Sequence, residues 1–144
     1  MVSTIETDHA ESPFQTVRIM INGEDLLVLV REYERVFAEK EGHPDLAGGY
    51  VNERLEHLKT KLQDPEKWPF AHDNEVAVLV CSCREEGCWP LMVSITRTDE
   101  TVTWSHFRQP HRHEQSPASY WDYAAFGPFV FETVQYDTAL SLLG

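Results

Sequence analysis

Three β-rich segments separated by short connections constrain the fold of this chain more than any other feature. Residues 76–81, 91–96 and 101–107 are rich in β-branched and aromatic side chains, and residues 98–100 supply a turn between the last two. Strands this close in sequence pair antiparallel, because a parallel pair needs a long crossover connection. The pattern therefore predicts an antiparallel meander.

Helices are predicted where apolar residues recur at helical spacing. The three predicted helices cover about residues 24–40, 52–62 and 133–143. Asn22 is suited to cap the first of them and Gly42 to end it. Residues 16–21 alternate and predict a further strand that joins the meander. The expected fold is α+β, a three- or four-stranded, mainly antiparallel sheet with about three helices packed on it.

The length of 144 residues fits one domain. Residues 1–14 are polar, acidic and without periodicity, which predicts a flexible N-terminal arm. Residues 15–144 then form a single α+β domain. No internal repeat is visible in the sequence.

The formal charge of −12, from 24 acidic against 12 basic residues, bears on the partners of the chain. Such a surface repels phosphate backbones, so we expect no nucleic-acid ligand, whereas a basic protein partner is compatible with it. The apolar runs are too short to cross a bilayer, and no basic and apolar leader opens the chain. We expect a cytoplasmic protein without a membrane partner and with an undetermined oligomeric state.

Three cysteines within eight residues are the densest concentration of reactive side chains: Cys81, Cys83 and Cys88. Strand alternation places the first two on one face. A tight loop over residues 84–87 then sets Cys88 opposite Cys83 across a hairpin. The three sulfurs are predicted to converge to about 4–7 Å.

Four interpretations of the converging thiols stay open. The first is a zinc site, with His106, His111 or His113 as the fourth ligand. The second is a reversible redox pair of Cys83 and Cys88, and the third is a cysteine nucleophile with a histidine base. The fourth, which we favour, is that small thiols fill the end of the hairpin against Trp89 and Trp104.

The segment over residues 104–113 gathers three histidines and two arginines in a mostly acidic chain. One interpretation is a ligand-binding surface, with aromatic walls, arginines for an anionic group and a histidine for proton transfer. The candidate residues for binding are Trp104, Arg108, Arg112 and Tyr123. The interpretation that we favour is a long loop held by aromatic burial, in which the arginines pair with carboxylates such as Asp122.

The cysteine hairpin and two later segments together resemble a family of small bacterial proteins. The resemblance rests on the hairpin CSCREEGCWP, the segment WSHFRQPHR and the region WDY…GPFVF, with supporting stretches from about Ile19 onward. That family has no established activity, so the resemblance implies only a bacterial, non-secreted single domain.

Two functions from different classes follow, and a third is kept. The first is a non-enzymatic acidic binding or regulatory protein of the immunity type, which docks a basic protein partner. The alternative is a zinc-binding protein or metalloenzyme that uses the three cysteines and a nearby histidine. The third is a small-molecule enzyme built on His106, His111, Arg108 and Tyr123, which requires a pocket where these groups meet.

Overall fold

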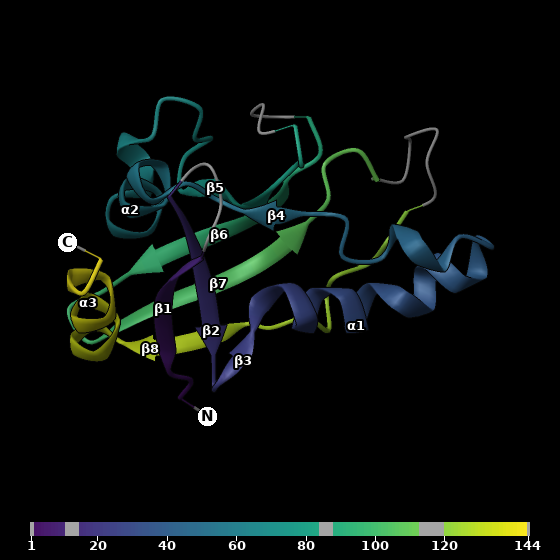
Figure 1. Cartoon of the computed structure of the whole chain (residues 1–144). Helices are drawn as coiled ribbons and strands as arrows, with labels where there is room; N and C mark the ends of the chain where they lie inside the picture. Colours follow the sequence, from purple (N-terminus) through teal and green to yellow (C-terminus); the bar gives the residue numbers. More distant parts are fainter. Residues whose placement is uncertain (1, 11–14, 84–87, 113–119, 144) are drawn as a thin grey trace.

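The computed structural model describes residues 2–10, 15–83, 88–112 and 120–143, which form two antiparallel sheets and three α-helices (Figure 1). The predicted α+β class and the antiparallel pairing are confirmed. The single sheet of three or four strands is wrong, because the strands divide into one sheet of five and one of three. Several strands are too short to show an alternating pattern in the sequence, which is why the prediction missed them.

The larger sheet has the strand order β4-β5-β6-β7-β8, and each strand pairs antiparallel with the next. Its strands are β4 (Val51–Asn52), β5 (Glu75–Val80), β6 (Leu91–Arg97), β7 (Thr101–Arg108) and β8 (Phe129–Glu132). The predicted meander is therefore confirmed as β5, β6 and β7. Residues 76–80 are all buried, so β5 is covered on both faces.

The smaller sheet has three antiparallel strands, and a tight turn joins the last two. Its strands are β1 (Ile5–Ala10), β2 (Thr16–Ile21) and β3 (Glu24–Asp25). Asn22 and Gly23 have φ of 53° and 79°, the conformation of a two-residue hairpin turn. Helix α1 (Leu26–Lys40) follows directly, and its N-terminal cap is Asp25, whose carboxylate accepts the N–H of Leu27 at 2.8 Å. The capping role predicted for Asn22 is therefore wrong, because Asn22 lies in the turn.

The N-terminal segment is part of the fold. Strand β1 pairs with β2 along its whole length, and the Ile5 side chain is completely buried. The predicted flexible arm is wrong for residues 5–10, whereas residues 11–14 lie outside the described residues. In this strand the exposed Glu6 and Asp8 alternate with the buried Ile5 and the half-buried Thr7. The sequence of such a half-exposed strand contains many polar residues, which is why it was interpreted as a flexible arm.

Backbone contacts join the smaller sheet to both outer strands of the larger one. The N–H of Ser3 donates to the carbonyl of Val130 in β8 at 2.7 Å. At the opposite edge, the N–H of Val17 in β2 donates to the carbonyl of Glu53, next to β4, at 3.0 Å. The smaller sheet thus covers edges that would otherwise be open. The strand over residues 16–21 meets the larger sheet only at this edge and does not extend the meander as predicted.

The three predicted helices are confirmed as α1, α2 (Leu55–Gln63) and α3 (Thr133–Ser141). In Figure 1, α2 and α3 lie at one end of the larger sheet and α1 extends away at the other. The buried residues of α1 recur at every fourth position and so form one face of the helix: Leu26, Val30, Glu34 and Ala38. No helix within the described ranges has the length and apolar character needed to cross a membrane.

The centre of the core is an aromatic group that connects three elements. Trp104 of β7 is completely buried and packs edge-on against Phe131 of β8 and Tyr136 of α3. Its indole N–H donates to the Tyr136 hydroxyl at 3.2 Å, and that hydroxyl donates to the Leu62 carbonyl of α2 at 2.9 Å. The polar ends of these large rings are therefore satisfied inside the core.

A bulge interrupts β7 near its C-terminal end. Ser94 of β6 pairs with Ser105, but Met92 pairs with Arg108, so β7 contains one extra residue between these pairs. Within the bulge His106 has a φ of 55°, the left-handed conformation that side chains other than glycine rarely adopt. Strained positions of this kind concentrate at functional sites, so the bulge directs attention to the surface that it faces.

Candidate metal centre

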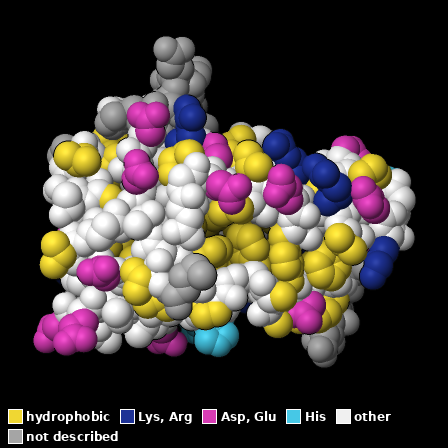
Figure 2. All heavy atoms as spheres, turned by 90° about the horizontal axis from the view of Figure 1, so that it is seen from below, with side chains coloured by type: hydrophobic (Ala, Val, Ile, Leu, Met, Phe, Trp, Pro, Cys, Tyr) yellow, Lys and Arg dark blue, Asp and Glu magenta, His cyan; other side chains and the backbone are white. Residues whose placement is uncertain are grey.

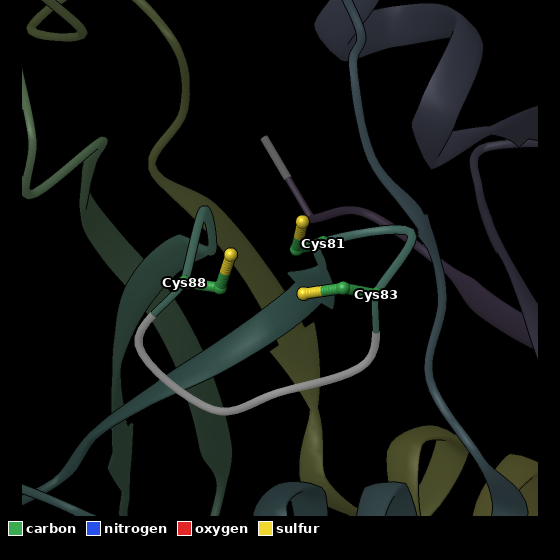
Figure 3. A group of neighbouring side chains, drawn as sticks. All are labelled: Cys81, Cys83 and Cys88. Atoms are coloured by element: carbon green, nitrogen blue, oxygen red, sulfur yellow. The ribbon is translucent and has the colours of Figure 1, made fainter.

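The three cysteines lie at the junction between β5 and β6, on a turn and not on paired strands. Strand β5 ends at Val80, Cys81 follows it, and Cys83 lies in the turn that comes next. Cys88 precedes Trp89, shortly before β6 begins. Figure 3 shows the three side chains arranged around one space between the two sides of this junction. Residues 84–87, predicted to form the tight loop, lie outside the described residues.

The sulfur atoms are close enough to share one ion. All three lie within 4.8 Å of one another. Zinc–sulfur bonds of about 2.3 Å at tetrahedral angles place two sulfurs about 3.8 Å apart, so a side-chain shift of about 1 Å suffices. The predicted convergence is confirmed, although its cause differs: a turn at Cys83 brings the thiols together, where strand alternation was expected.

The thiols are linked to one another by hydrogen bonds. The pKa of Cys81 is lowered because the backbone N–H of Cys83 and the thiols of Cys83 and Cys88 donate to its sulfur. The pKa of Cys88 is raised to about 12, chiefly through its thiol hydrogen bonds to Cys83 and Cys81. All three cysteines are free. The cluster therefore favours one thiolate, at Cys81, stabilised by its neighbours.

The thiols do not fill a hydrophobic space. Cys83 and Cys88 are exposed and Cys81 is half-buried, while Trp104 lies deep in the core. The interpretation that the cysteines act as small core side chains is therefore wrong for Cys83 and Cys88. An exposed group of three thiols needs an explanation other than packing.

Neither His106 nor His111, the two described histidines among the proposed fourth ligands, joins the sulfur cluster. His111 stacks on Trp89, with ring centroids 5.5 Å apart and an interplanar angle of 6°. His106 lies on the bulge of β7, where Nδ1 is 3.0 Å from the Ser105 hydroxyl oxygen. Among the described residues, no histidine, aspartate or glutamate joins the three sulfurs. His113 lies outside the described ranges.

The two arginines of the second candidate site are paired with carboxylates. Arg108 binds Glu75 through Nε and Nη2 at 2.6 and 2.7 Å, which raises the pKa of the guanidinium. Arg112 is buried, donates to the Glu41 carboxylate at 2.9 Å and lies 3.8 Å from the ring centroid of Trp121. The expected pairing with carboxylates is found, but with these glutamates in place of the suggested Asp122.

Arg112 also connects the cysteine junction to the rest of the molecule. Its guanidinium lies 5.5 Å from the ring centroid of Trp89, the residue that follows Cys88. Nearby, the amide of Gln109 donates to the carbonyl of Pro90 at 3.0 Å. One side of the junction is therefore fixed in place by the segment after β7.

A buried carboxylate, Glu34, is a feature that the sequence reasoning missed. It accepts hydrogen bonds from the N–H of Gly48 at 2.8 Å, from the hydroxyl of Tyr50 at 2.7 Å and from the hydroxyl of Tyr123. Burial nevertheless raises the pKa of Glu34 above its usual value. The sequence did contain a sign of this buried carboxylate. Glu34 lies four residues after Val30 and four before Ala38, so it falls on the apolar face of the helix. Tyr123 thus has a structural contact as well as its predicted place near the ligand surface.

Comparisons of the chain with family models, with curated proteins and with solved structures found no match.

Proposed function

We propose that the protein binds a thiophilic divalent metal ion, with zinc as the leading candidate, through Cys81, Cys83 and Cys88. The observation that carries the proposal is the convergence of three free thiols to within 4.8 Å. Zinc is commonly held by thiolates in tetrahedral geometry, and each thiol must lose its proton to bind. The pKa of Cys81 is lowered, so this thiol loses its proton more readily than an ordinary cysteine.

A metal site accounts for the cluster better than the other chemistries of cysteine. A disulfide uses two sulfurs and leaves the third without a role. A cysteine nucleophile requires a base, and no described histidine lies in the sulfur cluster. A metal ion uses all three sulfurs together, and their exposure leaves a path for the ion to enter.

The occupant of the fourth position decides between a structural and a catalytic role. Structural zinc sites are closed by four protein ligands, whereas catalytic sites keep one position for water or substrate. The described residues supply three ligands. A spectroscopic count of protein ligands in the zinc-loaded protein distinguishes the two roles.

The proposal is tested by titrating the metal-free, reduced protein with cobalt(II), a spectroscopic substitute for zinc. We expect one equivalent to bind with an intense thiolate-to-cobalt charge-transfer band, which zinc then displaces. Cys83→Ser is expected to weaken binding by at least about tenfold, because it removes one of three sulfur ligands. Ser141→Ala is the control, since Ser141 is an exposed residue of α3 and is not among the groups that act on the pKa of Cys81. Absence of the band in the unaltered protein would refute the proposal.

A second proposal follows from the net charge of −12, which favours a basic protein partner. Because such binding is electrostatic, it should weaken as salt rises. A partner search from the source organism at low and high salt tests it, and finding no salt-sensitive basic partner contradicts it.

A further inference from the structure

A separate cavity of about 570 Å³ lies beside the C-terminal half of β7. Its walls come from residues 105–109 and 120–128, with Arg112 between them, and none of the three cysteines lines it. The volume is within the range of about 300–1,000 Å³ typical of small-molecule sites. The His106 bulge forms part of its rim, so the strained backbone faces a cavity large enough for a ligand.

The walls of this cavity are aromatic and held in place by their neighbours. Phe107 and Phe126 pack edge to face with ring centroids 4.8 Å apart, and both are buried. Trp121 is buried between Arg112, which follows β7, and Phe37 of α1. The ring centroids of Trp121 and Phe37 are 6.0 Å apart. Figure 2 shows hydrophobic side chains gathered in a band across one face of the molecule, with both acidic and basic side chains around it. Such walls are formed before any ligand arrives.

The charges that line the cavity favour a cation. Arg108 and Arg112 both line it, but each guanidinium is already neutralised, by Glu75 and by Glu41. Asp122 also lines it, and among the residues that the structure describes, the N–H of Ala124 donates to Oδ1 of this carboxylate at 2.9 Å. No cation pairs with Asp122 among the residues that the structure describes. Among the described lining residues, with His106 neutral, the uncompensated charge is therefore negative.

Other features of the chain act in the same direction. The net charge of −12 raises the local concentration of small cations around the whole molecule. Tyr120, which lines the cavity and is 49% exposed, adds an aromatic ring that solvent and ligand can reach. Aromatic rings attract cations through their negative faces, and a carboxylate beside them adds a charge-assisted hydrogen bond.

We propose that this cavity binds a small organic cation, an ammonium ion with a hydrophobic body, whose charged group lies against Asp122 and whose apolar part contacts the aromatic walls. None of the three cysteines lines this site, so its proposed ligand is separate from any metal bound at the cysteine cluster. It also reverses the expectation that Arg108 and Arg112 receive an anionic ligand, because both arginines have carboxylate partners.

The experiment uses three probes of similar shape and different charge: 2-phenylethylammonium, 2-phenylethanol and 3-phenylpropionate. Calorimetric titration of the full chain is expected to give saturable binding of the ammonium ion, about tenfold or more tighter than of the alcohol. Asp122→Asn should reduce the affinity for the ammonium ion to that for the alcohol. Asp99→Asn, an equal change of charge at an exposed turn between β6 and β7, should leave it unchanged.

Three outcomes overturn the proposal. One is that none of the probes binds saturably. Another is that Asp122→Asn and Asp99→Asn weaken ammonium binding equally, which assigns the effect to net charge alone. The third is tighter binding of 3-phenylpropionate, lost in Arg108→Gln, which makes the cavity an anion site. Unchanged thermal unfolding of each variant verifies that the fold is intact.

Discussion

Arg112 and Arg108 form a natural matched pair for testing what holds the segment after β7 in place. Both are arginines that bind a glutamate, but the Arg112 side chain is 4% exposed and the Arg108 side chain is 51% exposed. Replacing either by glutamine removes one positive charge and keeps most of the aliphatic stem. A difference in stability between the two variants therefore reports burial and ring contacts and not net charge.

The expected loss for Arg112→Gln follows from its contacts. Removing one partner of a buried ion pair costs about 3–5 kcal/mol, and less where the other carboxylate reaches water. Glu41 is 21% exposed, so about 1–3 kcal/mol is reasonable for this pair. The stacking on Trp121 at 3.8 Å adds about 1 kcal/mol. We expect a total loss of about 2–4 kcal/mol. For Arg108→Gln we expect a smaller loss of about 1–2 kcal/mol, because the Arg108 guanidinium is half-exposed but leaves behind a Glu75 carboxylate that is 12% exposed.

The assay is chemical denaturation followed by circular dichroism, with tryptophan fluorescence as a second probe. A loss of about 3 kcal/mol lowers the melting temperature of a chain of this size by about 6–12 °C. Fluorescence should also report increased solvent access at Trp121, which packs against Arg112. Equal losses for the two variants, or a loss under about 1 kcal/mol for Arg112→Gln, would refute the reasoning.

Three further expectations concern other parts of the molecule. Ile5→Ala should lower the free energy of unfolding by about 2–5 kcal/mol in denaturant titrations, because Ile5 is completely buried, and Val2→Ala at 53% exposure should change it little; equal small effects would restore the flexible-arm interpretation. His106→Gly should keep or raise the melting temperature and His106→Val should lower it, because φ is 55° there; the reverse order would contradict the left-handed bulge. Zinc affinity should fall as pH falls, and binding should release protons, because thiolates are the ligands and the pKa of Cys88 is about 12; calorimetry in buffers of different ionisation enthalpy measures the release, and an affinity independent of pH would exclude thiolate ligation.

Periodic segments long enough to form several turns or ladder pairs were predictable from sequence. All three helices and the strands β2, β5, β6 and β7 were expected near their observed positions. The two-residue strands β3 and β4 could not be identified, because two residues show no period and their pairing depends on distant strands. Strand β8 is held by its pairing with β7 and by a bridge to Ser3, both distant from it in sequence. Tertiary pairing, and not local preference, defines these elements.

The candidate sites were predictable to different degrees. The spacing of Cys81, Cys83 and Cys88 within one junction was enough to expect convergence, because short-range geometry dominates there. The partners of Arg108 and Arg112 were not, since Glu75 and Glu41 are distant in sequence and reach them only in the folded chain. Glu34 was predictable in part, because it is a polar residue on the apolar face of α1. A polar residue at such a position indicates a buried hydrogen-bond network, and that inference was not made.

The measurement that bears most directly on the central claim is the metal content of the protein purified without chelator under reducing conditions. Elemental analysis should find close to one equivalent of zinc per chain, bound through the three converging thiols. A chelator should then lower the melting temperature, because an ion that binds only the folded state stabilises it. Less than about a tenth of an equivalent, with melting unchanged by the chelator and no uptake of added zinc, would contradict the account.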